Sequence, residues 1–269
     1  HFLPGNEGTS FEERMLAVKD SAIANEMLDF YLQPATLQAH REHALELMGI
    51  AAHVYADTFS HYGFSGLPSD LNLVDTGTLD IDEGHSESIK DYIKQRMDGF
   101  LANWGGLPRL GHGAVLTHPD RPYLRWSFRY QDGRPSMRDN QLTFLEGCRK
   151  LHARFAQFAQ LYYGAAWKGA TPWQKFVEEV AAILATEAAA DDRVEAWLDA
   201  MHREHLGPQV QPCLSYEVDT WNAQVERYRA GSDTAAFARS NAYRFFAAAD
   251  YHRNYVLKRL LPRAGLRVA

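Results

Sequence analysis

The sequence contains very little cysteine: Cys148 and Cys213 are the only two among 269 residues. Two cysteines are too few for a disulfide framework or for a cysteine-rich zinc module. We expect two reduced, packed thiols, and a single Cys148–Cys213 disulfide is the alternative. A metal centre in this chain would therefore draw on other ligands, and twelve histidines are available for it.

Long hydrophobic runs are also absent. No apolar stretch approaches the roughly 18 residues that a transmembrane helix requires, so we expect no membrane-spanning segment. Basic residues are not in excess either, because the formal net charge is −6, and this disfavours a dedicated binder of duplex nucleic acid. The acidic balance does not exclude hydrolysis of a phosphate ester, since bound metal ions bring their own positive charge.

The common catalytic motifs are missing as well. The sequence has no G-x-S-x-G nucleophile elbow, no P-loop, no Rossmann glycine pattern and no H-E-x-x-H motif. Its first five residues, HFLPG, form neither a signal peptide nor a natural initiator. We therefore expect a processed or cut chain, whose site a missing N-terminal fragment or a larger effector chain could complete. A soluble protein, cytoplasmic or exported without a visible signal peptide, is the expectation, and no compartment is assigned.

What is present is a strong helical pattern on a globular composition, with 46% hydrophobic and 23% charged residues. We predict an all-α fold: one domain over residues 1–269, a multi-helix bundle around a central metal-bearing helix. Residues 1–165 would hold the metal site and 166–269 a C-terminal helical part. The predicted helices span residues 10–32, 36–62, 86–104, 110–116, 140–164, 172–187, 190–204, 214–229 and 233–260. Residues 66–84 are predicted as loop and 131–135 as a turn, and only residues 123–130 alternate like a strand.

The segment over residues 45–66 carries the most information. Between Leu47 and Phe64 it contains no Lys, Arg, Glu or Gln, so we predict a helix that is buried nearly all round at the centre of the bundle. The same helix contains His53, Asp57 and His61. An unpartnered buried carboxylate costs several kcal/mol, so Asp57 must be hydrogen-bonded, ion-paired or bound to metal.

The spacing of these three residues is H-x3-D-x3-H. Residues four apart lie on one helical face, about 6 Å apart along the axis. His53 and Asp57 can then share one ion, and Asp57 and His61 another, whereas His53 and His61 are about 12 Å apart and do not share one. The spacing predicts a metal cluster with the Asp57 carboxylate between two ions. The alternative is a buried His–Asp hydrogen bond without metal.

Residues elsewhere could complete the metal shell. We predict His112, whose flanking glycines allow a close approach, and His1 as further ligands. Asp120, in a loop stiffened by prolines, is a ligand or a supporting carboxylate, and an ion pair with Arg121 or Arg125 is the alternative. Asp57 and Asp120 receive the predicted catalytic roles. The remaining histidines are predicted to be exposed, namely His40, His43, His85, His118, His152, His202, His205 and His252.

The run HVYADTFSH over residues 53–61, with HFLPG before it and GHG and PDRPY after it, resembles an uncharacterised family of bacterial proteins over about the first 160 residues. More distantly, the helical plan with H-x3-D on a central helix is similar to the zinc-dependent phospholipase C and single-strand nuclease superfamily. That resemblance implies three zinc ions with one bridging Asp, and His53 and Asp57 match its His–Asp pair. His61 departs from the superfamily spacing, and Leu116 stands where a carboxylate would follow His112.

Three functional interpretations follow. The first is a metal-dependent phosphoesterase, phospholipase C-like or nuclease-like, in which a zinc-activated water attacks a small-molecule or lipid phosphodiester. The second is a non-catalytic helical interaction protein or toxin module, with a closed structural metal site or none. The third is a fragment of a larger exported effector. His and carboxylate ligands suit zinc, but they also suit manganese, iron or nickel.

Overall fold

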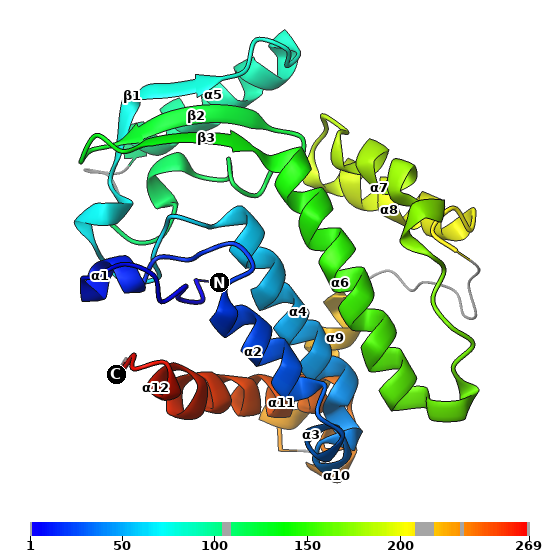
Figure 1. The fold of residues 1–269 in the computed structure, drawn as a ribbon. Coiled ribbons are helices and arrows are strands. Elements are labelled where there is room, and N and C mark those ends of the chain that lie inside the picture. Colours follow the sequence, from blue (N-terminus) through cyan, green and yellow to red (C-terminus); the bar gives the residue numbers. More distant parts are fainter. Residues whose placement is uncertain (1, 104–108, 208–217, 232–233, 268–269) are drawn as a thin grey trace.

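The computed structural model describes residues 2–103, 109–207, 218–231 and 234–267 of the chain. The fold is mostly helical, as the sequence predicts, and it contains one small three-stranded antiparallel sheet (Figure 1). None of the helices in the described ranges is long and apolar enough to cross a membrane. The division into residues 1–165 and 166–269 stays a prediction.

The central helix is α4 (Ala44–Ser60), which packs against α2 (Ala22–Tyr31), α6 (Asn140–Tyr163) and α11 (Asn241–Tyr255). Tyr55 and Phe59 lie in its buried face, at 1% and 2% exposure. The prediction that this helix is buried nearly all round is wrong, because Leu45, Gly49 and His53 form an exposed stripe at intervals of four residues. The side chain of His53 is 61% exposed. The helix that was predicted to bear the metal is therefore central, but one of its faces is open.

The predicted helix over residues 10–32 is interrupted. It begins as α1 (Phe11–Arg14) at the predicted capping box, in which Ser10 and Glu13 each accept from the other's backbone N–H. The next residues leave the helix, because Ala17 N–H donates to the Phe64 carbonyl at 2.8 Å and Gly63 N–H donates to the Ala17 carbonyl at 2.8 Å. These bonds between distant segments of the same chain replace the i−4 bonds of a helix, and they hold the N-terminal segment against the end of α4.

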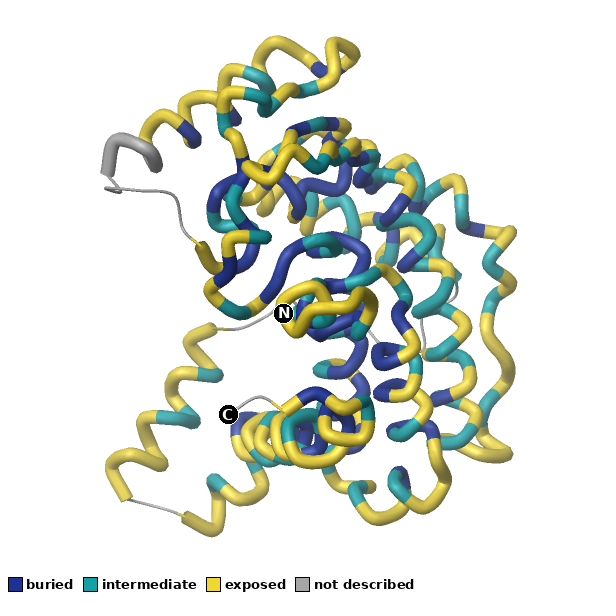
Figure 2. Tube along the Cα trace, turned by 60° about the vertical axis from the view of Figure 1, so that its left-hand side comes forward, coloured by how far each residue is buried: buried dark blue, intermediate teal, exposed yellow. Residues whose placement is uncertain are grey.

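Most of the other predicted helices are present with shorter bounds, and the ones predicted over residues 36–62 and 233–260 are divided. The helix predicted over residues 110–116 is only a short 3-10 turn, Gly113–Val115. Figure 2 shows α9 and α10 mostly exposed at the edge of the molecule. The remaining elements are α3 (Pro34–Ala39), η1 (Arg41–His43), η2 (Asp70–Asn72), α5 (Glu87–Asn103), η3 (Gly113–Val115), η4 (Gly164–Ala166), η5 (Trp173–Lys175), α7 (Val177–Leu184), α8 (Ala190–His202), α9 (Val218–Arg229), α10 (Thr234–Phe237), the π-helical turn η6 (Val256–Leu260) and α12 (Leu261–Arg263).

The sheet consists of β1 (Val74–Ile81), β2 (Arg125–Tyr130) and β3 (Pro135–Asp139) in that order. The predicted strand over residues 123–130 is confirmed as β2, whose Trp126, Phe128 and Tyr130 are buried. The predicted loop over residues 66–84 is wrong at β1. This edge strand pairs on one side only, with a register shift between Asp75 and Asp80, so it tolerates the polar, glycine-containing sequence that indicated a loop.

The sheet and α4 meet where the helix ends. Phe64, three residues beyond His61, belongs to the same buried cluster as Val74, Val115 and Phe128, and Figure 1 shows the sheet lying over this end of the helix. The loop that leads into β2 is therefore held against the last turn of α4. This packing brings residues 110–123 to the predicted metal ligands.

One of the two cysteines lies in the described part of the chain. Cys148 on α6 is a free thiol, and burial raises its pKa to about 11. Such a thiol is largely protonated at neutral pH and is a poor nucleophile. Cys213 lies outside the described residues.

Candidate metal centre

Three ligand-type side chains meet at the end of α4: His61, His112 and Asp120. One ligand atom from each lies within 4.8 Å of the other two. His61 ends the helix, because its φ of −99° and ψ of 10° are no longer helical although its N–H still donates to the Asp57 carbonyl at 2.8 Å. His112 and Asp120 flank the short η3 turn and reach His61 from the loop before β2. Two segments about fifty residues apart thus build one site.

The distances between the ligand atoms suit a metal ion. His61 Nε2 lies 2.8 Å from Asp120 Oδ1, and His112 Nε2 lies 3.8 Å from Asp120 Oδ2. The two imidazole rings face each other with centroids 4.6 Å apart. In a tetrahedral zinc site with bonds of about 2.0–2.1 Å, neighbouring ligand atoms are about 3.3 Å apart. Small side-chain movements would therefore bring all three atoms to bonding distance.

His112 is held in the form that binds metal. Its Nδ1–H donates to the Leu116 carbonyl at 2.6 Å, which leaves a lone pair on Nε2, the nitrogen that faces Asp120. Burial lowers the pKa of His112, against the opposite effect of the Asp120 charge. A neutral imidazole whose second nitrogen donates to a carbonyl is the usual arrangement of a metal-binding histidine.

Asp120 provides the carboxylate of the centre. Its side chain is 43% exposed, so the centre is open to solvent at this residue. Burial acts to raise its pKa, but the hydrogen bond from His61 and the charges of His112, His61 and Arg121 outweigh it, so the pKa of Asp120 is lowered. The alternative of an ion pair with an arginine is wrong. Arg125 pairs with Asp82 at 3.0 Å, and Arg121 donates to Tyr123 and Thr117.

His53 and Asp57 form a neighbouring pair on α4, with 3.5 Å between His53 Nε2 and Asp57 Oδ2, as the i, i+4 spacing predicts. Burial raises the pKa of Asp57, the charges of His61 and His53 lower it, and the charge of Asp120 raises it. Asp57 therefore interacts electrostatically with His53 and also with His61 and Asp120 of the cluster. It is not one of the three clustered ligands, and the roles of His53 and Asp57 as metal ligands stay predictions.

Phe2 closes one side of the centre, with its ring centroid 5.1 Å from that of His61 and 5.8 Å from that of His112. This contact explains Gly111, where φ is +56° and an added Cβ would lie 2.4 Å from Phe2 Cζ. The predicted need for glycine beside His112 thus has a definite cause. His1 lies outside the described residues, and its role as a ligand stays a prediction.

Three histidines that were predicted to be exposed are buried instead: His85, His118 and His252, at 7%, 1% and 8% exposure. His118 Nδ1–H donates to the Val115 carbonyl and its ring lies against Trp126, so burial lowers its pKa to about 4. Polar neighbours in sequence indicated exposure, but the partners of these rings are distant along the chain or in the backbone. Only Pro119 next to His118 suggested an ordered turn there.

The fold and the site together define a class: mostly α-helical proteins with a His–His–Asp cluster at the end of a central helix. The chain belongs to a family of unknown function, DUF6765, whose family model matches residues 1–260. The match extends well beyond the first 160 residues that the motifs cover. No curated protein and no solved structure matches the chain.

Proposed function

We propose that this protein is a metal-dependent phosphoesterase that acts on a small-molecule or lipid phosphodiester, with zinc bound by His61, His112 and Asp120. The observation that carries the proposal is the cluster of these three ligand atoms within 4.8 Å, around a carboxylate that is 43% exposed. Three protein ligands with an open fourth position are typical of catalytic zinc, whereas structural sites are closed by four ligands.

A bound zinc ion would supply a water of lowered pKa and a positive charge for the phosphoryl oxygens. The residues around it have separate tasks. His112 presents Nε2 because Leu116 holds its other nitrogen, and His61 would bind zinc through Nε2 with its ring proton on Nδ1. Zinc binding would weaken as the pH falls, because protons compete with the metal for the imidazole nitrogens.

Asp57 is the proposed proton acceptor of the reaction. Burial raises the pKa of its carboxyl group, which favours proton uptake at a site close to the metal ligands. Its Oδ2 faces His53 Nε2 at 3.5 Å, and His53 is open to solvent on its other side. A proton taken up by Asp57 would thus have a path through His53 to bulk water.

The first test is metal content by plasma mass spectrometry, after chelator treatment and reloading with zinc. We expect at least one zinc per wild-type chain and its loss in Asp120→Asn. Asp132→Asn is the matched control, because Asp132 lies in the β2–β3 turn and pairs with Arg134 there. Wild-type protein that retains no stoichiometric zinc after reloading would overturn the proposal.

Activity is tested next with bis(p-nitrophenyl) phosphate and with phosphatidylcholine vesicles. We expect hydrolysis by zinc-loaded wild type and about a hundredfold lower kcat in Asp57→Asn if Asp57 acts as general base. Metal bound at full stoichiometry without hydrolysis of either substrate would favour the non-catalytic interpretation, in which the same residues form a structural site.

A further inference from the structure

Two arginines from distant parts of the chain meet beside the metal centre. Arg121 directly follows Asp120 and is 8% exposed, while Arg193 lies in the first turn of α8 and is half-buried. Tyr123 lies between them: Arg121 Nη1 donates to its hydroxyl at 2.8 Å, and the Arg193 guanidinium is 5.7 Å from its ring centroid. The C-terminal part of the chain thus adds a positive charge next to the candidate site.

Neither guanidinium has an acidic partner among the described residues. In the part of the chain that the structure describes, no carboxylate lies within 4.0 Å of the nitrogens of Arg121 or Arg193, and the Nε atoms of both are buried without a hydrogen-bond acceptor. Burial lowers the pKa of Arg193, as does the charge of Arg121, against the opposite effects of Tyr123 and Asp120. The two arginines are therefore close enough to repel, and an anion at this place would relieve that repulsion.

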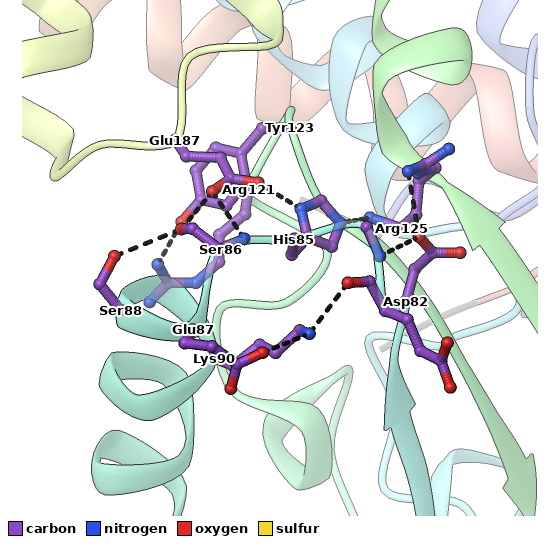
Figure 3. A network of polar contacts seen from close by, with 12 residues as sticks. Asp82, His85, Ser86, Glu87, Ser88, Lys90, Arg121, Tyr123, Arg125 and Glu187 are labelled. Atoms are coloured by element: carbon purple, nitrogen blue, oxygen red, sulfur yellow. Dashed lines mark hydrogen bonds and ion pairs between the residues drawn. The ribbon is translucent and has the colours of Figure 1, made fainter.

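Glu187, an acidic residue of the same region, is hydrogen-bonded to other groups. His85 Nδ1–H donates to Glu187 Oε1 at 2.6 Å, and Ser86 N–H donates to Glu187 Oε2 at 3.2 Å. The other ring nitrogen of His85 accepts from Arg125 N–H at 2.8 Å, so the imidazole proton must point to Glu187. Figure 3 shows these hydrogen bonds of Glu187 to His85 and Ser86, called the Glu187 clamp below, with Arg121 and Tyr123 next to them.

The clamp also positions Arg193. Glu187 lies three residues before the start of α8 at Ala190, and its bonds fix this connection to the loop between β1 and α5. Helix α8 therefore begins beside Tyr123, and the side chain of Arg193 reaches the loop that carries Asp120 and Arg121.

We propose that Arg121 and Arg193 form a subsite for a phosphate oxyanion next to the metal centre. The proposal deepens the proposed phosphoesterase function, on which its placement next to a reaction centre rests. Arg121, held by Tyr123 and Thr117, supplies a fixed charge, and Arg193, which is half-exposed, makes the direct contact. Guanidinium groups suit this task because their planar fork matches the oxygens of a phosphate group.

The subsite is tested by titration calorimetry of inorganic phosphate into chelator-treated, metal-free protein. We expect binding by wild type, at least about tenfold weaker binding by Arg193→Gln, and an intermediate affinity for Arg193→Lys, because an ammonium lacks the fork. Arg203→Gln is the matched control and should bind as wild type does, because Arg203, at the C-cap of α8, pairs with Asp199 at 2.9 Å. Equal phosphate affinity in Arg193→Gln and Arg203→Gln, or no binding by wild type, would overturn the proposal.

The metal-free arm keeps this proposal separate from the phosphoesterase. Phosphate binding that depends on Arg193 in a protein that binds no zinc would support the subsite and overturn the metal centre. Phosphate binding that requires zinc and is unchanged in Arg193→Gln would support the metal centre and overturn the subsite.

A kinetic arm distinguishes two sources of the oxyanion. Bis(p-nitrophenyl) phosphate carries only the reacting phosphate, so a lower kcat/KM in zinc-loaded Arg193→Gln would assign the arginines to that group. An unchanged kcat/KM together with weaker phosphate binding would assign them to a second anionic group of the substrate.

Discussion

A single hydrogen bond decides which nitrogen of His112 faces Asp120. The bond runs to the carbonyl of Leu116, four residues farther along the chain. The backbone of Leu116 thus performs the orienting task, and the carboxylate comes from Asp120 farther along the same loop. The flanking glycines could identify His112 as a candidate, but only the folded loop identifies its partner.

We expect a single added methyl group at Gly111 to lower the free energy of unfolding measurably. Gly111→Ala would meet Phe2 Cζ at 2.4 Å in a backbone with φ +56°, so the unfolding free energy should fall by roughly 2–4 kcal/mol. Gly133→Ala is the control: φ is +88°, but nothing lies within 4 Å, so only the backbone term of about 1–2 kcal/mol applies. Equal losses in urea unfolding of the two variants would contradict the contact with Phe2.

His252 should make the protein sensitive to mild acid. Its Nδ1 is hydrogen-bonded to the Tyr31 hydroxyl at 2.9 Å, and burial lowers its pKa to about 4. The unfolded chain binds this proton near pH 6.5, so the contribution of His252 to stability is complete above that pH and is lost as the pH falls toward 4. The loss is of the order of 1–3 kcal/mol.

The measurement is urea unfolding at a series of pH values between 7 and 4. We expect the unfolding free energy of His252→Gln to fall less between pH 7 and pH 4 than that of wild type. Glutamine cannot titrate in this range but can still form a hydrogen bond with Tyr31. His118, whose pKa is also about 4, remains in the variant and should leave part of the acid sensitivity in place. A pH profile identical to that of the wild type would contradict the assignment to His252.

Among the elements, the helices were predictable where their capping and periodicity were local. Helix α6 begins at Asn140, where the Asp139 side chain accepts from Leu142 N–H, and its predicted bounds are nearly correct. Helix α1 stops at Arg14 for a reason that no local pattern contains, since residues 16 and 17 pair with residues 63–65. Strand β1 was missed for a similar reason: its partner β2 lies more than forty residues away.

The connection between α7 and α8 should become more mobile when the hydrogen bonds of the Glu187 clamp are removed. Glu187→Gln removes one of two acceptor oxygens that bind His85 and Ser86, so we expect a loss of about 1–2 kcal/mol and faster hydrogen exchange at the Ser86 amide. Glu179→Gln on α7 is the control. Its pair with His205 is exposed, and its removal should cost well under 1 kcal/mol. Unchanged exchange at Ser86 would contradict a holding role for Glu187.

At the scale of the whole molecule, the end of the chain returns to its beginning. Asn6 Nδ2 donates to the Ala264 carbonyl at 3.1 Å, and Arg14 Nη2 donates to the same carbonyl at 3.0 Å. The helical class and the central position of α4 could be predicted from composition and from the apolar run around Asp57. The choice of Asp120 over Asp57 as the clustered carboxylate could not, because it depends on the path of a loop between α5 and β2.

Zinc should stabilise the whole fold, because it joins the end of α4 to the loop before β2. At a free zinc concentration one hundred times the Kd, the unfolding free energy should rise by about 2.7 kcal/mol. Thermal unfolding over a range of zinc concentrations measures this effect, and Asp120→Asn should show little or none of it. Equal stabilisation of wild type and Asp120→Asn would place the ion elsewhere.

The contact of Phe2 with the glycines around it also has a consequence for evolution. An added Cβ at Gly66 would lie 3.0 Å from Phe2 Cβ, and one at Gly111 would lie 2.4 Å from Phe2 Cζ. A larger residue at position 66 or 111 is thus compatible with the metal ligands only when position 2 becomes smaller. In an alignment of the family we therefore expect positions 2, 66 and 111 to covary, with small residues conserved at 66 and 111 wherever an aromatic residue occupies position 2.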